Sequence, residues 1–344
     1  TDTTTSSISI SVSASGGTNS VATYYYSINN GAYSSSSSNT KTFTGLSKGT
    51  TYTIKVYVKD TNGVDSSVKT TSAETESEIF LADVCSNGTN LATCIKNYYN
   101  EAGQEMSSMY YHTSSLANSA ADNSYRYAGA NPNNYVCFGS TASTCPSDNL
   151  YRIIGVFGSE VKLIKATSYG SYAWDSGGSN TWSTSSIRTT LNTTYLNSIS
   201  STWQNKIATH TWKVGGMDWS ETNTAKQYYD VEVGSSSSST TDSMKIGLMY
   251  VSDYGFAASN SYWTTALYNY SSAKSLNWLY LGSDEWTISS NLDDSYGAFI
   301  VAAEGSVSGL PVDFTNWTRP CFYLSSSTTY VSGSGTNSDP IRIN

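Results

Sequence analysis

The sequence predicts a mostly β fold in two parts, a small β-sandwich over residues 1–75 and a larger α+β domain over residues 76–344. Charged residues make up only 13% of the chain, so Ser, Thr, Asn and Gly must provide solubility, which is typical of β-rich extracellular proteins. The 28 Tyr, 9 Trp and 8 Phe supply enough apolar area for packed cores, which argues against a disordered chain. A polar, acidic segment over residues 72–78 is expected to link the two parts.

The first part shows the alternation of β-strands. Ile8, Ile10 and Val12 alternate with Ser, which predicts a half-buried strand. Further along, Leu46 precedes a short polar turn and then Tyr52, which opens an alternating strand over residues 52–58. This stretch resembles the fibronectin type III family. The resemblance implies that the Tyr52 hydroxyl bonds back to the preceding turn and locks the strand crossover.

Residues 60–65 (Asp-Thr-Asn-Gly-Val-Asp) alternate carboxylates about a glycine, as a calcium loop does. The remaining calcium ligands are missing from the sequence that follows. We therefore favour an Asn-Gly turn between the last two sandwich strands. Calcium is the one cofactor that the sequence does not exclude.

The second part mixes helices and strands without strict alternation, which predicts an α+β domain. Apolar residues at helical spacing over residues 91–99 predict an opening helix, and those over 185–207 predict one helix or two short ones. A β-hairpin is expected over residues 152–165. Further strands are expected at residues 245–251, 286–288, 298–302 and 321–324.

Several stretches of the second part carry a family resemblance. They are residues 122–139, 148–157, 161–165, 207–215, 245–255, 277–281, 285–288, 319–324, 332–336 and 339–343. Together they resemble a family of large Firmicute surface and pilin-like proteins, in which this Tyr/Trp-rich module follows fibronectin-type repeats or a type IV prepilin-like N-terminus. The closing segments from Trp286 onward are also similar to the core of C-type-lectin-like domains. The resemblance implies an extracellular location and implies no reaction.

Four of the five cysteines form two close pairs, Cys85 with Cys94 and Cys137 with Cys145, and Cys321 is left over. Each pair brackets a stretch that can turn back on itself, so two short-loop disulfides are predicted, in keeping with an oxidising compartment. The alternative is that all five are free, buried thiols.

No sequence motif of an enzyme is present, and we expect a protein without catalytic activity. His112 and His210 are the only imidazoles, and both are expected to be structural because no accompanying motif is present. The acid pairs Asp284-Glu285 and Asp293-Asp294 point to opposite sides of any strand, so neither predicts a glycosidase centre. Solvated loop acids or a weak calcium site are the expected alternatives.

Several tryptophans lie among Gly, Ser, Asp and Asn, where their rings could stack on sugars. Trp174, Trp182 and Trp219 are the candidates for that role. The alternative, favoured because Trp is usually buried, is that they fill the core of a domain that is short of Leu.

The net charge of −8 and the lack of a basic run argue against a nucleic-acid partner, and no apolar stretch reaches the length of a membrane span. We expect an extracellular structural or adhesive protein that self-associates into a surface filament or contacts other surface proteins. A carbohydrate-binding, lectin-like adhesin is the alternative. A hydrolase is a third hypothesis, for which the sequence offers no set of catalytic residues. Attachment is expected at the N-terminus or through subunit contacts, with the strand over residues 3–13 free to pair with another subunit.

Overall fold

The computed structural model describes residues 1–344 and divides them into two compact units, residues 1–79 and residues 80–344. Strands hold 33% of the residues and helices 21%, so the mostly β, two-part fold is confirmed. The first unit ends after strand β7 (Lys69–Glu74), and helix α1 (Leu81–Val84) opens the second. The division falls directly after the acidic segment 72–78. The expectation that this whole segment is a linker is wrong, because residues 72–74 belong to β7 and the backbone N–H groups of Thr75 and Glu76 donate to carbonyls of the first unit.

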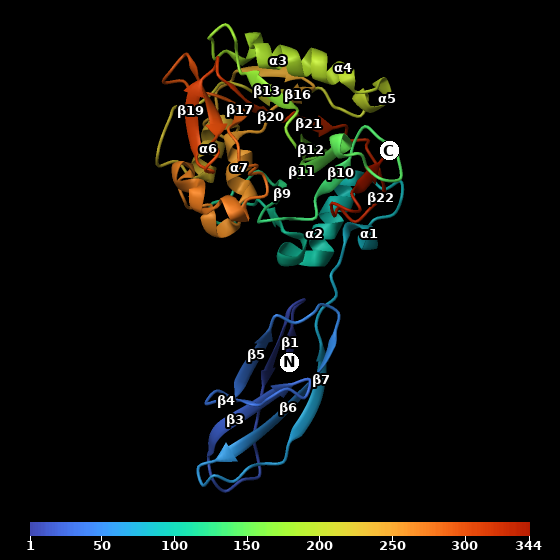
Figure 1. The fold of residues 1–344 in the computed structure, drawn as a ribbon, viewed down its shortest axis with the longest axis vertical. Helices are drawn as coiled ribbons and strands as arrows, with labels where there is room; N and C mark the ends of the chain where they lie inside the picture. Colours follow the sequence, from blue (N-terminus) through green and yellow to red (C-terminus); the bar gives the residue numbers. More distant parts are fainter. The chain divides into compact units, whose positions relative to one another are not determined.

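Two antiparallel sheets, drawn in blue in Figure 1, form the first unit. One has the strand order β1-β2-β5 and the other the order β4-β3-β6-β7. Their bounds are β1 (Asp2–Thr3), β2 (Ser7–Ser11), β3 (Val21–Ile28), β4 (Ser34–Ser36), β5 (Thr40–Thr44) and β6 (Thr51–Asp60). Ile8 and Ile10 of one sheet pack against Tyr26, Ile54 and Val56 of the other and form the core. Because side chains alternate across each strand, the residues between these positions, Ser9 in β2 and Lys55 in β6, face outward.

The Tyr52 hydroxyl accepts a hydrogen bond of 2.7 Å from the backbone N–H of Ser47, in the turn before β6. This is the tyrosine corner that the sequence predicts, with the hydroxyl acting as acceptor. The sandwich is therefore confirmed, while membership of the fibronectin type III family stays a prediction.

The segment over residues 60–65 forms a turn, as favoured from the sequence. The Asp60 carboxylate accepts hydrogen bonds of 2.9 Å from the backbone N–H groups of Asn62 and Val64. It also accepts one of 3.0 Å from the side chain of Asn19. The Asp60 oxygens are thus held within the hairpin.

The expectation of a free strand over residues 3–13 is wrong. Strand β2 lies between β1 and β5 and is hydrogen-bonded on both sides. The free edges of the sandwich are instead β1 and β5 in one sheet and β4 and β7 in the other. β2 is not an edge strand because the turn at residues 4–6 folds the first residues of the chain back onto it.

A nine-stranded sheet forms the centre of the second unit, with the order β16-β21-β12-β11-β10-β23-β22 and with β9 and β8 attached at β11. The bounds are β8 (Met109–Tyr111), β9 (Tyr125–Tyr127), β10 (Tyr135–Cys137), β11 (Leu150–Phe157), β12 (Glu160–Lys165), β16 (Ile246–Gly247), β21 (Cys321–Leu324), β22 (Tyr330–Ser332) and β23 (Ile341–Ile343). β11 and β12 are the predicted hairpin. Both strands are buried over nearly their whole length, because the sheet is covered on both faces.

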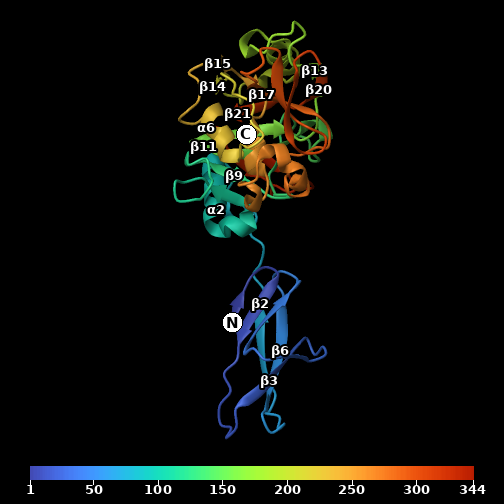
Figure 2. The ribbon, with the colours of Figure 1, turned by 90° about the vertical axis from the view of Figure 1, so that its left-hand side faces the viewer.

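A five-stranded sheet in the order β13-β20-β17-β18-β19 and a two-stranded ribbon, β14 with β15, complete the β structure. Figure 2 shows β13, β17 and β20 of this sheet. The bounds are β13 (Gly170–Ala173), β14 (His210–Lys213), β15 (Thr241–Met244), β17 (Glu285–Ser290), β18 (Gly297–Val301), β19 (Val307–Pro311) and β20 (Thr315–Thr318). The strands predicted near 286–288, 298–302 and 321–324 are confirmed as β17, β18 and β21.

The predicted opening helix is confirmed as α2 (Leu91–Ser107), and residues 185–207 form a succession of short helical pieces (Figure 1). These pieces are α3 (Ser186–Thr190), the π-helical turn η3 (Leu191–Tyr195), α4 (Leu196–Ser198) and α5 (Ser201–Gln204). The remaining helical segments are α6 (Ala225–Glu232), α7 (Val251–Ala257) and the 3₁₀ turns η1 (Ser147–Asn149), η2 (Trp182–Thr184), η4 (Asn260–Tyr262), η5 (Leu267–Ser272) and η6 (Lys274–Leu276).

The strand predicted over residues 245–251 is mostly wrong, because only β16 is extended and helix α7 begins at Val251. Two buried carboxylates stabilise the start of that helix. The Asp253 carboxylate accepts a hydrogen bond from the backbone N–H of Tyr250. The Glu232 carboxylate accepts hydrogen bonds of 2.8 Å each from the backbone N–H groups of Val251 and Ser252. A carboxylate at a helix N-terminus satisfies donors that have no intrahelical partner, so polar capping overrides the apolar strand pattern.

Candidate functional site

The structure joins Cys85 to Cys94 and Cys137 to Cys145, the two pairs predicted from the spacing. Cys321 is a free thiol buried in β21, and burial raises its pKa to about 12. A thiol held neutral in this way is a poor nucleophile. The alternative of five free thiols is therefore wrong.

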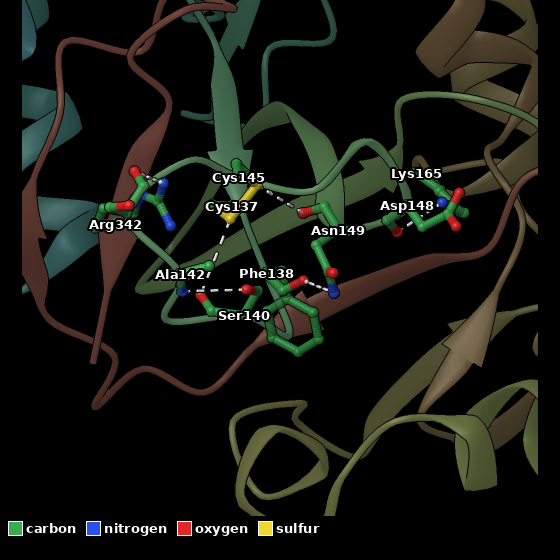
Figure 3. Close-up of a disulfide and its surroundings, with 10 residues drawn as sticks. Cys137, Phe138, Ser140, Ala142, Cys145, Asp148, Asn149, Lys165 and Arg342 are labelled. Atoms are coloured by element: carbon green, nitrogen blue, oxygen red, sulfur yellow. Dashed lines mark hydrogen bonds between the residues drawn. A yellow bond between two sulfur atoms is a disulfide. The ribbon is translucent and has the colours of Figure 1, made fainter.

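The disulfide between Cys137 and Cys145 shapes the end of the β10–β11 hairpin (Figure 3). Cys137 is the last residue of β10 and pairs with Leu150, the first residue of β11. Within the connection, the backbone N–H of Phe138 donates a hydrogen bond of 2.9 Å to the Asn149 carbonyl, and the Asn149 side chain donates one of 2.9 Å to the Phe138 carbonyl. The covalent link and these bonds fix the position of Phe138 and Asn149.

A hollow of about 400 Å³ opens beside this fixed segment, and we name it the tyrosine pocket. Its aromatic lining is Phe138, Tyr151, Tyr169 and Tyr195, and its charged and amide lining is Asp148, Asn149 and Lys165. Gly139, Ile199 and three serines (Ser168, Ser198 and Ser200) complete the wall. The volume lies within the range of small-molecule sites.

At the base of the pocket, the hydroxyls of Tyr151 and Tyr195 are hydrogen-bonded to each other. Burial raises the pKa of Tyr151 to about 12 and that of Tyr195 well above its usual value, so both hydroxyls stay protonated. Lys165 is buried in the wall and donates a hydrogen bond of 2.7 Å to the backbone carbonyl of Asp148, as Figure 3 shows. Burial lowers the pKa of Lys165.

Tyr169 is the half-buried ring of the pocket and the one placed to meet a ligand. Its ring packs edge-on against Tyr195, with 4.9 Å between centroids, and stacks on Tyr172 at 5.8 Å. The pocket thus presents an aromatic ring next to amide, hydroxyl, carboxylate and ammonium groups. Such a combination can hold a compact polar molecule with one apolar face, as a sugar ring has.

The proposed sugar-stacking role is wrong for Trp174 and Trp182. Both indoles are fully buried, pack edge-on against each other at 5.4 Å, and fill the core, as the alternative predicted. Their N–H groups are bonded inside, to the carbonyl of Thr287 and to the sulfur of Met244. A buried ring has no face to offer a ligand.

Trp219 is half-buried, and the stacking role stays a prediction for this residue. One of its faces is covered by Phe299, which stacks on it with 5.8 Å between centroids. Tyr268 meets it edge-on at 5.9 Å and is itself exposed. Trp219 lies outside the tyrosine pocket, so the two are separate candidates for binding sugars.

Both histidines sit in aromatic surroundings, as predicted. His112 is buried and its Nδ1 accepts a hydrogen bond of 3.1 Å from the backbone N–H of Ala120, and burial lowers its pKa to about 3. The His210 ring stacks on Tyr323 at 3.8 Å, and its Nδ1 lies 2.9 Å from a Glu160 carboxylate oxygen. Burial lowers the pKa of His210.

The acid pairs are used inside the fold. Glu285, expected to be solvated, is buried and forms a two-point ion pair with Arg319, so that expectation is wrong. Asp284 and Asp294 accept hydrogen bonds from backbone N–H groups nearby, and Asp293 accepts one of 2.8 Å from that of Trp219. The structure contains no group of three or more His, Cys, Asp or Glu side chains placed to hold a metal ion.

The structure also contains no helix long and apolar enough to cross a membrane.

A buried ionic cluster, missed by the sequence analysis, lies between β9, β12 and α7. The Lys162 Nζ lies 2.6 Å from Asp253, whose other oxygen is 3.3 Å from the guanidinium of Arg126. Arg126 also pairs with Asp122 at 2.7 Å. The two cations and two anions balance, so the cluster has the features of a structural ion-pair network.

No protein-family model matches the chain, and no curated protein matches it. Among solved structures it is similar to a chitinase from Bacillus thuringiensis, with 24% identity and a TM-score of 0.20 over 22% of this chain and 12% of that chain. A family 28 exopolygalacturonase from Yersinia enterocolitica shows 16% identity and a TM-score of 0.21 over 27% of this chain and 24% of that chain. A SusE-like protein shows 13% identity and a TM-score of 0.18 over 99% of this chain and 91% of that chain. Likenesses at these TM-scores define neither the fold nor the function of this chain.

Proposed function

We propose that this chain is a non-enzymatic, extracellular surface module that binds carbohydrate in the tyrosine pocket. The observation that carries the proposal is the geometry of the pocket, in which the half-buried ring of Tyr169 stands next to Asp148, Asn149 and Lys165. A ring face covers the apolar side of a sugar, and the polar groups exchange hydrogen bonds with its hydroxyls. The single carboxylate among the lining residues is Asp148, whereas glycoside hydrolysis commonly uses two.

The extracellular location is supported by the two short-loop disulfides. Disulfides persist in oxidising compartments and are rare where thiols are kept reduced. The resemblance to Firmicute surface proteins fits the same location, and we propose membership of that family on the motifs between residues 122 and 343.

The test is a glycan array followed by titration calorimetry on the strongest neutral glycan. Tyr169→Ala removes the ring and is expected to weaken binding about tenfold or more, since a stacked ring contributes on the order of 1 kcal/mol beyond its buried area. Tyr33→Ala is the matched control, because Tyr33 is an exposed tyrosine of the first unit and belongs to neither candidate site.

Trp219→Ala separates the two candidate sites. Loss of binding in Trp219→Ala with full binding in Tyr169→Ala would move the sugar site to Trp219 and contradict the proposal. Absence of binding to every glycan on the array would contradict it as well. Hydrolysis of a bound glycan would contradict the non-enzymatic part.

A filament subunit is the second candidate function, and the free edge of β7 favours it. This strand pairs with β6 on one side only, and its residues are exposed except Ala73. An unpaired edge can add a strand from another subunit through backbone hydrogen bonds. Electron microscopy and light scattering of the purified chain test it, and a monomer at all concentrations would count against it.

A further inference from the structure

A second hollow lies on the other side of strand β11 from the tyrosine pocket. Successive side chains of a strand point to opposite faces, so Tyr151 lines the tyrosine pocket while Arg152 lines this second hollow. Its volume is about 440 Å³, and its charged lining is Arg152, Lys274 and Arg319, with no carboxylate. We name it the arginine pocket.

The three cations of the arginine pocket differ in how their charge is balanced. Arg319 is neutralised by Glu285, which accepts from its Nε at 2.5 Å and from its Nη2 at 2.8 Å. None of the ion pairs of the chain includes Arg152 or Lys274. The pocket therefore carries two uncompensated positive charges in a chain whose net charge is −8.

Arg152 is the unusual group, because it is only 7% exposed and has no counter-ion. Its guanidinium donates to neutral oxygens only: the side chain of Asn134 at 2.7 Å, the carbonyls of Pro132 at 3.1 Å and Trp278 at 3.3 Å, and the side chain of Asn131 at 3.5 Å. These four contacts leave one of the five guanidinium N–H groups without an acceptor. Arginine is rarely buried unless it is paired.

Two aromatic rings partly stabilise the buried charge. The guanidinium carbon lies 4.3 Å from the ring centroid of Tyr135 and 4.6 Å from that of Trp278. Such contacts are favourable by about 0.5–2 kcal/mol each, whereas removing an ion from water costs several kcal/mol. Burial, and then the nearby Arg319, lower the pKa of Arg152 to about 10, in line with a charge that is not neutralised.

We propose that the arginine pocket binds the anionic group, carboxylate or sulfate, of an acidic sugar, with Arg152 at its floor and Lys274 at its rim. An anion supplies the missing counter-charge and an acceptor for the free N–H group, and the planar guanidinium is suited to both oxyanions. Lys274 is exposed and adds a second positive charge where the ligand enters. That the anion is carried by a sugar rests on the proposed function of the neighbouring tyrosine pocket.

The test measures binding of three probes to the full chain by calorimetry: a uronic-acid oligosaccharide, a sulfated oligosaccharide and the neutral counterpart of the first. We expect at least one acidic probe to bind tenfold or more tightly than the neutral one, with the preference weakening at high salt. The two acidic arms show whether carboxylate or sulfate is preferred. Inorganic sulfate alone is expected to compete only at millimolar concentration.

Three variants locate the anion. Lys274→Glu changes an exposed residue and is expected to lower the affinity for acidic probes about tenfold with no effect on the neutral probe. Arg152→Gln is expected to abolish the preference for acid, and Arg152→Lys to retain part of it, with the thermal midpoint confirming that each is folded. Lys69→Glu, the same charge reversal at an exposed lysine outside the pocket, is the matched control and is expected to have no effect.

Equal binding of acidic and neutral probes by the wild-type chain would overturn the proposal. It would also fall if the folded Lys274→Glu variant kept the full preference for acid. Binding of a monomeric uronate that depends on Arg152, in a chain that binds no neutral glycan, would support the arginine pocket and contradict the tyrosine pocket. The two proposals therefore fail on different measurements.

Discussion

Asp253→Asn tests whether the buried ionic cluster holds the second unit together. Asp253 is the shared counter-ion of Lys162, at 2.6 Å, and Arg126, at 3.3 Å. Asparagine keeps the size of the side chain and an oxygen that can still accept from the backbone N–H of Tyr250. The substitution therefore removes the charge and replaces the carboxylate oxygen that faces Arg126 by an amide NH2 group.

The expected loss of stability comes mainly from leaving Lys162 without a counter-ion. Arg126 keeps Asp122 as a partner at 2.7 Å, whereas Lys162 has no other carboxylate within ion-pair distance and its side chain is 1% exposed. Leaving one charge of a buried pair unpaired costs about 3–5 kcal/mol. For a unit of this size, about 2–4 °C per kcal/mol gives a fall in the thermal midpoint of roughly 6–20 °C.

Tryptophan fluorescence is the assay, because all 9 tryptophans lie in residues 80–344 and report on this unit alone. Asp230→Asn is the matched control, since the pair of Asp230 with Lys226 is partly exposed and contributes about 0–1 kcal/mol. Lys162→Met combined with Asp253→Asn is expected to cost less than the sum of the single changes. A loss below 1 kcal/mol in Asp253→Asn, or one equal to that of Asp230→Asn, would refute the reasoning.

Three further outcomes are expected. Tyr52→Phe removes the acceptor of the Ser47 N–H bond and is expected to destabilise the first unit by about 1 kcal/mol, seen as roughly fivefold faster hydrogen exchange in β6. Replacing both Cys137 and Cys145 by Ala opens a loop of sequence separation 8 and is expected to cost about 2–3 kcal/mol in urea unfolding followed by fluorescence. Because burial lowers the pKa of His112 to about 3, the unfolded chain takes up its proton first as the pH falls. The stability of the second unit is therefore expected to drop between about pH 6.5 and 3, and less so in His112→Gln.

Each of these outcomes has its own control. Tyr33→Phe changes an exposed tyrosine of the first unit that makes no hydrogen bond, so equal exchange rates in both tyrosine variants would contradict the role of the corner. Unfolding of the wild-type chain that is insensitive to a reductant would contradict the disulfide prediction. An identical pH profile in wild type and His112→Gln would assign the acid sensitivity to other groups.

The sequence correctly predicts those parts of the fold that depend on residues close together in the chain. Alternation of Ile8 with Ile10, and of Ile54 with Val56, places these residues in one core because strand side chains alternate across a sheet. Tyr52 has a fixed distance to its turn, so its hydrogen bond to Ser47 is predictable. The closeness of the cysteines within each pair has the same short-range character.

The candidate sites depend on contacts that no short window contains. Lys162 is paired with a carboxylate 91 residues away, and Trp278 lies 126 residues from the arginine that it covers. Trp174 and Trp182 are flanked by polar residues, yet they are buried, because distant strands close over them. One usable signal was present: a lysine or arginine inside an otherwise apolar strand indicates a buried charge.

The contrast between the buried cations is the strongest physical argument for a ligand. The fold places Glu285 against Arg319 and Asp253 against Lys162, both within hydrogen-bonding distance and both away from solvent. Arg152, in strand β11 of the central sheet, instead contacts carbonyl and amide oxygens and two aromatic rings, and no carboxylate. Arg152 lines a hollow with no acid in its wall, and the other buried cation that lines this hollow, Arg319, is already neutralised by Glu285. A charge left unbalanced where a small molecule can enter is a charge that an incoming anion can balance.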